Sequence, residues 1–216
     1  MINGKHAAAK PWIETYLKDN PKDEAAEDLL ISCDKVDDLK KDSMRYSVEL
    51  SKINTGESNF SPIVYKDGIV FTTDKTGAKK SKGLSIISDT YAWTGRPYLD
   101  MYFSKPDKSG GWSAPVPLKG DVNGLYHDGP AAFSTDSIMY FTRNNYVGRK
   151  TKLGSDEAVN LKIYESRYRN NTWTEVQEFP YNSDNYSTGH PAITKDGNTM
   201  YFVSDMPGGL GGTDLW

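Results

Sequence analysis

One motif occurs three times between residue 60 and the end of the chain, and it limits the possible folds more than any other feature. Each copy joins a proline to a turn formed by Asp-Gly or Asp-Ser and then to an apolar run, at residues 61–71, 129–141 and 190–202. The spacing from Pro62 to Pro130 is 68 residues, and from Pro130 to Pro191 it is 61. Such a period indicates structural units that stack, because one unit alone cannot bury its own faces.

Composition and charge narrow the class of protein further. Aromatic residues make up 12% of the chain, which also has 19 Gly and 11 Pro, and this balance favours short strands joined by tight turns. The net charge of −3 offers no broad basic surface, so we expect no nucleic-acid partner. No apolar run approaches the ~20 residues that span a bilayer, and the first residues lack a signal-peptide pattern. We therefore expect no membrane insertion.

The first 34 residues predict a helical hairpin, followed by a charged connector at 35–45. Asn20 is the expected cap of the second helix, with Pro21 in its first turn. Cys33, the single cysteine, is expected to be a small buried apolar residue, and it excludes a disulfide framework within the chain. The apolar face of the hairpin is predicted from helical spacing to contain Ala9, Ile13, Tyr16, Leu17, Ala26, Leu29, Leu30 and Cys33.

Residues 46–216 predict a mainly β region in which each repeat supplies four short antiparallel strands. The first strand begins at the proline, the second is the apolar run, and Pro115 and Pro117 mark the fourth as an edge strand. Four antiparallel strands form one blade of a β-propeller. The predicted blades span 60–119, 126–181 and, incompletely, 186–216, while the alternating residues 46–53 are a candidate closing strand.

This count gives about three blades, whereas propellers close with ~4–8. The chain is therefore predicted to form half of a six-bladed ring, and two ways of completing it remain open. A longer parent protein supplies further blades, which is the favoured solution, or a homodimer closes the ring with strand 46–53 of each copy completing the open blade of the other.

Four segments resemble the TolB-like (PD-repeat) propeller of OmpA-family periplasmic lipoproteins: 60–62 (Phe-Ser-Pro), 66–68 (Lys-Asp-Gly), 91–102, and the ending 206–216 (Met-Pro-Gly-Gly-Leu-Gly-Gly-Thr-Asp-Leu-Trp). The helical part is similar to the end of a tetratricopeptide segment, which precedes the propeller in that family. The resemblance implies a periplasmic, outer-membrane-associated protein of the type IX secretion and gliding kind, with envelope proteins as partners. It also implies peptidoglycan binding, but through an OmpA-like domain that this chain lacks, as it lacks the signal peptide and lipid anchor.

The sequence contains none of the common motifs that carry catalysis. There is no Gly-x-Ser-x-Gly elbow, His-Glu-x-x-His helix, phosphate-binding Gly-Lys-Ser/Thr loop or calcium loop. Asp67, Asp136 and Asp196 recur at one position of each repeat, where an Asp suits a tight turn. We therefore predict no enzyme activity, no catalytic residue, no cofactor and no metal.

Two groups of residues are candidates for binding. The loop 74–97 contains the predicted partner contacts Tyr91, Trp93 and Arg96, and the loop 144–160 adds Arg149 and Lys150. Together with Arg143 and Lys152, the last two predict a local positive patch. The residues expected at the mouth of a central channel are Ser61, His127, Asp128 and His190.

These candidates favour a non-enzymatic scaffold for protein–protein interaction within a larger, cell-wall-anchored envelope complex. A carbohydrate-active or glycan-binding propeller is the alternative, because paired carboxylates at a catalytic separation cannot be recognised from sequence.

Overall fold

The computed structural model describes residues 4–75 and 90–216. The chain is mainly β, with antiparallel sheets and two helices. It divides into two compact units, Met1–Leu50 and Ser51–Trp216.

The first unit is a helical hairpin of α1 (His6–Asp19) and α2 (Glu24–Lys40), followed by the short 3-10 helix η1 (Ser43–Arg45). The hydroxyl of Tyr16 donates to Asp23 at 2.9 Å, and Lys10 pairs with Asp34 at 2.6 Å. The predicted pair of helices is confirmed, but the predicted cap is wrong: Asp23, not Asn20, accepts from the backbone N–H of Ala26. Neither helix in the described part of the chain has the length and apolar character to span a membrane.

Helix α2 also extends through part of the predicted connector. It continues to Lys40 because residues 35–40 contain neither Gly nor Pro and so nothing that interrupts helical hydrogen bonding. The irregular part of the connector is limited to the residues around η1.

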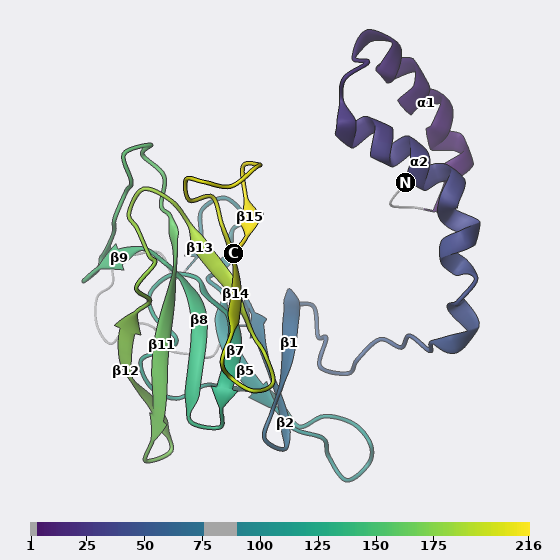
Figure 1. The fold of residues 1–216 in the computed structure, drawn as a ribbon. Helices are drawn as coiled ribbons and strands as arrows, with labels where there is room; N and C mark the ends of the chain where they lie inside the picture. Colours follow the sequence, from purple (N-terminus) through teal and green to yellow (C-terminus); the bar gives the residue numbers. More distant parts are fainter. Residues whose placement is uncertain (1–3, 76–89) are drawn as a thin grey trace. The chain divides into compact units, whose positions relative to one another are not determined.

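The second unit contains three larger antiparallel sheets (Figure 1). Sheet 1 consists of β1 (Asn59–Tyr65), β2 (Gly68–Thr73), β5 (Asp100–Ser104) and β6 (Val116–Pro117). Sheet 2 consists of β7 (Asp128–Thr135), β8 (Ile138–Asn144), β11 (Leu161–Arg169) and β12 (Thr172–Glu178). Sheet 3 consists of β13 (Thr188–Ile193), β14 (Met200–Ser204) and β15 (Asp214–Leu215).

The predicted strand order is confirmed: the sheets have the orders β1-β2-β5-β6, β12-β11-β8-β7 and β13-β14-β15. Pro117 lies in β6, at the edge of sheet 1, as its missing backbone donor requires. Two small hairpins were not predicted: β3 (Thr90–Tyr91) with β4 (Arg96–Pro97), inserted between β2 and β5, and β9 (Tyr146–Val147) with β10 (Lys150–Thr151), inserted between β8 and β11.

The predicted strand at 46–53 is not formed in this structure. These residues have no regular secondary structure apart from a turn at 52–53, and the side chains of Tyr46, Val48 and Leu50 are exposed. Their alternation suits a strand, but a strand also needs a neighbouring edge with which to exchange backbone hydrogen bonds.

The three sheets pack against one another in sequence order. Strand β7 of sheet 2 contacts β1, β2 and β5, and β13 of sheet 3 contacts β7, β8 and β11. The core between sheets 1 and 2 joins Val70 and Met101 to Met139, Phe141 and Trp173, all of them buried. Trp173 thus packs between sheets 1 and 2.

Two polar contacts are repeated from sheet to sheet. The side chain of Asn123 brackets Met101 by accepting from its N–H at 2.8 Å and donating to its C=O at 3.0 Å. Asn182 brackets Ile163 in the same way, at 2.9 and 2.7 Å. A second contact caps the start of each first strand: Asp74, Asn144 and Asp205 accept from the backbone N–H groups of Ser58, His127 and Ser187.

Candidate functional site

Aromatic side chains gather at the end of the sheets where the chain leaves β2 and β8. They come from the β3–β4 hairpin and the residues that join it to β5, from the connection between β6 and β7, and from β9. We call this group the aromatic row, and it consists of Tyr91, Trp93, Tyr98, Tyr126, His127 and Tyr146.

The rings of the row contact one another in sequence across three segments. The centroids of Tyr91 and His127 lie 4.7 Å apart, and those of Tyr98 and His127 lie 4.9 Å apart, both nearly perpendicular. Tyr126 then links Tyr98, at 5.4 Å, to Tyr146, at 5.3 Å. Edge-to-face pairs of this kind stabilise by about 0.5–1.5 kcal/mol beyond burial. The row is therefore a preorganised surface rather than a set of independent side chains.

Trp93 is the exposed end of the row. Its ring centroid lies 6.4 Å from that of Tyr91, and 86% of its surface is accessible to solvent. Tyr91 is half-buried, so it supports Trp93 from beneath while leaving the indole open. An exposed indole on a rigid support is typical of the anchoring residue of a binding surface.

Arg96 holds the hairpin that presents Trp93. Its guanidinium forms an ion pair with the buried carboxylate of Asp74, with one contact of 3.0 Å, and also donates to the C=O of Gly56 at 3.2 Å. Burial works against ionisation of Asp74, but the hydrogen bonds from Arg96 and Ser58 outweigh it and lower the pKa of Asp74. Arg96, predicted as a partner contact, therefore positions the hairpin.

A buried ion pair lies directly next to the row. Asp128 is fully buried and binds Arg143, which also donates to the C=O of Asp121 at 2.8 Å and packs its guanidinium over the rings of Tyr146 and Phe141. Burial disfavours the charge of Arg143, but the carboxylate of Asp128 raises the pKa of Arg143 overall. Asp128, predicted at a channel mouth, is enclosed by protein and unavailable to a ligand.

The row itself is uncharged. Burial raises the pKa of Tyr98 and of Tyr146, so both hydroxyls stay protonated at neutral pH. His127 accepts a hydrogen bond at Nδ1 from the backbone N–H of Leu99 at 3.1 Å, which requires this nitrogen to be unprotonated. The row thus offers uncharged aromatic rings for contact with other rings and apolar groups.

Two of the four residues of the predicted positive patch are exposed on one hairpin. Arg149 and Lys150 are exposed on the β9–β10 hairpin, and the backbone C=O of Arg149 accepts from Tyr126 at 3.0 Å, which ties this hairpin to the row. Arg143 is buried, and Lys152 pairs with Asp184. The four-residue patch was therefore wrong, because two of its members neutralise carboxylates within the chain.

Ser61 and His190 are placed on β1 and β13 rather than in the row. Both are exposed, have positive φ angles of 49° and 54°, and lie at the bulges in the pairing of these strands with β2 and β14. The backbone N–H of His190 donates to Thr142 at 2.8 Å. Of the candidates, the structure brings together Tyr91, Trp93, His127 and the hairpin of Arg149 and Lys150.

Three tyrosines of the row, Tyr98, Tyr126 and Tyr146, were not among the predicted site residues. The available signal was that each tyrosine adjoins the end of a strand, in segments that the repeat places at the same end of the sheets. The predicted loop 74–97 also includes residues 76–89, which lie outside the described residues.

Asp184 anchors the loop 145–160 on which the basic hairpin is carried. Its carboxylate accepts from Lys152, from Lys162 at 3.0 Å and from Asn145 at 2.8 Å. These hydrogen bonds, with that of Lys152 the strongest, hold the pKa of Asp184 well below its usual range.

We expect Asp184→Asn to lower the free energy of unfolding at pH 7 by about 1–2 kcal/mol, since charge-assisted hydrogen bonds are lost at a partly solvated site. The depressed pKa means that the ionised carboxylate stabilises the fold above pH ~4 and that this contribution is lost as the pH falls below it. Urea unfolding between pH 7 and pH 2 should show the gap to wild type closing. Asp156→Asn in the same loop is the matched control, and a gap independent of pH would contradict the assignment.

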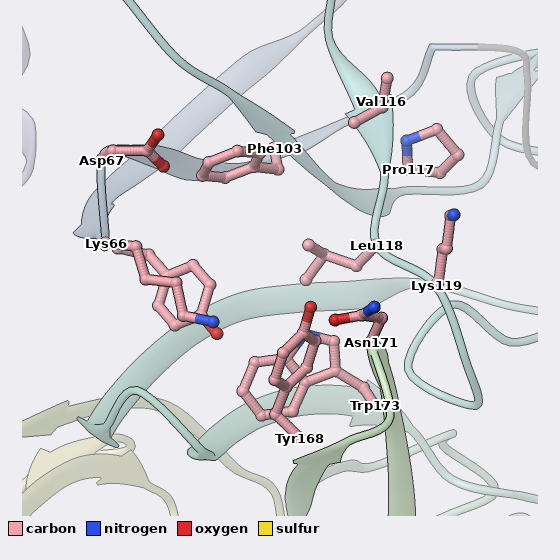
Figure 2. Close-up of a pocket in the computed structure, with 11 residues that line it drawn as sticks. Lys66, Asp67, Phe103, Val116, Pro117, Leu118, Lys119, Tyr168, Asn171 and Trp173 are labelled. Carbon is pink, nitrogen blue, oxygen red and sulfur yellow. The ribbon is translucent and has the colours of Figure 1, made fainter.

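A hollow lies at the end of sheets 1 and 2 opposite the aromatic row, near the β1–β2 and β11–β12 turns. Figure 2 shows Phe103, Leu118, Tyr168 and Trp173 around this space, with Lys66 reaching in from one side. The cavity measures about 340 Å³. The ammonium of Lys66 lies 4.2 Å from the ring centroid of Tyr168, which is a cation–π distance.

Comparison with known proteins adds no relative: no family model, no curated protein and no solved structure matches the chain. Within residues 4–75 and 90–216, no group of three or more His, Cys, Asp or Glu side chains is placed to hold a metal ion.

Proposed function

We propose that this chain is a non-enzymatic scaffold that binds a partner protein through the aromatic row. The observation that carries the proposal is the exposed indole of Trp93, held by Tyr91 and by the Arg96–Asp74 ion pair, beside two exposed basic residues, Arg149 and Lys150. Surfaces with aromatic residues and arginine on a rigid support are those that dominate protein–protein binding energy.

The architecture we propose for the scaffold is three blades of a β-propeller, the third lacking its fourth strand. The meander order of sheets 1 and 2, their face-to-face packing and the repeated Asn brackets support it. In a propeller the loops at one end of the ring lie side by side, and the aromatic row occupies such an end.

The location and larger assembly are proposed on the resemblance alone. It favours the periplasm, association with the outer membrane and a type IX secretion or gliding complex, with peptidoglycan bound by a domain outside this chain. The carboxylates nearest the row are engaged, Asp128 by Arg143 and Asp74 by Arg96, which favours binding over acid–base catalysis.

Capture from an envelope extract of the source cells tests the proposal. The wild-type chain should retain a defined protein, identified by mass spectrometry, and Tyr91→Ala/Trp93→Ala should reduce its recovery at least ~30-fold, the loss of a 2 kcal/mol hot spot. Trp12→Ala is the matched control, because it removes a similarly exposed indole from α1.

A glycan ligand is the alternative, since an exposed indole supported by a tyrosine also offers a flat face to a sugar ring. Soluble glycan fragments released from the same envelopes distinguish the two. Retention of glycan without protein, or loss of protein capture when fragments compete, would replace the protein-binding proposal with glycan binding.

A further inference from the structure

Sheet 1 has a face that points away from sheet 2, and so has sheet 3. These two faces resemble the two faces that pack together between neighbouring sheets of the chain. We infer that these faces bind each other between copies, so that sheet 3 of one copy of this chain packs head to tail on sheet 1 of a second copy. The inference concerns surfaces remote from the aromatic row and does not depend on the proposed function.

The first half lies on the face of sheet 1 that points away from sheet 2. Phe71 pairs with Tyr102 across β2 and β5, as Phe141 pairs with Tyr164 across β8 and β11. The apolar cluster on this face of sheet 1 contains Ile53, Ile69, Phe71, Tyr102 and Trp112. The residues at the same repeat positions, which sheet 2 packs against sheet 1, are Val122, Met139, Phe141, Tyr164 and Trp173. The outer face of sheet 1 therefore has the same pattern of apolar residues as the face of sheet 2 that packs against sheet 1.

A groove marks this face as unfilled. It measures about 210 Å³ and is lined by apolar residues that include Ile53, Phe60, Ile69 and Phe71. Phe60, at its rim, is partly exposed. The corresponding space on sheet 2 is filled by side chains of sheet 1, Val70 and Met101 among them.

The second half lies on the far face of sheet 3. Met101, Ile163 and Leu215 have the same position in the repeat. They pair with Thr72, Thr142 and Val203, each of which directly follows the phenylalanine of the second strand of its sheet. Met101 and Ile163 are 0% exposed because the next sheet covers them, whereas Leu215 is 78% exposed. Tyr201 is likewise 54% exposed at the position where Val70 is 1% exposed. Sheet 3 thus exposes apolar residues at the positions where sheets 1 and 2 bury apolar residues against the next sheet.

Asn54 supplies a matching polar contact. It follows Ile53 as Asn123 follows Val122, and Asn123 and Asn182 bracket the backbones of Met101 and Ile163 in the preceding sheet. The residue equivalent to these two is Leu215. Phe202 and Trp216 exchange both backbone hydrogen bonds, so the N–H and C=O of Leu215 point away from β14, toward the open edge of sheet 3.

The occupant that fits both faces is a second copy of this chain, because each copy carries both halves. The exposed, alternating residues Tyr46, Val48 and Leu50 precede Asn54 much as β6 and β12 precede Asn123 and Asn182. They are therefore placed to add the missing fourth strand beside β15 of the other copy. Pairing of this kind satisfies an open sheet edge and two apolar faces at once.

Cross-linking between positions 54 and 215 tests the geometry. In a Cys33→Ser background, Asn54→Cys and Leu215→Cys are made as separate proteins and treated with a short bis-maleimide. We expect adducts only in the mixture, each joining residue 54 to residue 215. Adducts formed by either variant alone, through 54 with 54 or 215 with 215, would overturn the head-to-tail arrangement.

Sedimentation of the unmodified chain tests the association itself. We expect dimers or larger species at about 100 μM, and Leu215→Asp should weaken association at least ~10-fold. Leu210→Asp is the control, since Leu210 is also fully exposed near sheet 3 but lies in the loop before β15. A chain that stays monomeric at this concentration, or equal effects of the two substitutions, would overturn the inference.

Discussion

Asp128→Ala is expected to lower the free energy of unfolding by about 3–5 kcal/mol, because it leaves the buried guanidinium of Arg143 without its counter-charge. The carboxylate also accepts from the backbone N–H of Gly124, so the connection between β6 and β7 loses an anchor as well. Chemical denaturation followed by far-ultraviolet circular dichroism measures the loss.

Two further variants separate charge from packing at this site. Asp128→Leu combined with Arg143→Met should recover most of the stability, since a buried ion pair can be replaced by apolar residues at little cost. Asp136→Ala, at an exposed turn of sheet 2, should change stability by less than about 0.5 kcal/mol. A small effect of Asp128→Ala, similar to that of Asp136→Ala, would show that the pair is not buried.

Trp173→Ala is expected to cost about 3–5 kcal/mol, as do other large aromatic truncations in a packed core. Trp173 is fully enclosed between sheets 1 and 2, with ring centroids 5.1 Å from Tyr168, 5.8 Å from Phe133 and 5.9 Å from Tyr65. Its removal opens a cavity in the core between sheets 1 and 2.

Trp112→Ala is the matched comparison, since Trp112 has the equivalent position in sheet 1 but only partly buried surroundings. At low protein concentration we expect it to cost less than half as much as Trp173→Ala. Equal costs in dilute solution would mean that the outer face of sheet 1 is already a complete core, and the head-to-tail inference would lose its basis.

The sheets could be predicted from the sequence because the repeat records local properties. Proline at the first strand, a tight turn after it and an unbroken apolar run are determined by backbone geometry and burial, and each lies within a few residues of the next. These signals also set the predicted strand order, which is the order observed in the sheets.

The candidate site could not be predicted in the same way, because its contacts are not determined by the repeated motif. The bulge between Asp128 and Ala131 shifts the pairing of β7 with β8 and brings Asp128 opposite Arg143, so simple alternation could not reveal this ion pair. Tyr126 and Tyr146 meet only because two long connections leave the sheets at the same end. Residues 46–53 show the converse case: their alternation predicted a strand, but alternation alone does not form one, and these residues are irregular in the structure.

The aromatic row as a protein-binding surface is tested most directly by placing a photo-reactive phenylalanine at position 93. Irradiation with an envelope extract should yield one main protein adduct at this position, with peptides mapped by mass spectrometry. The same reagent at position 12, another exposed tryptophan site, should not give that adduct. No protein adduct at position 93, or the same set of adducts at both positions, would contradict the proposal.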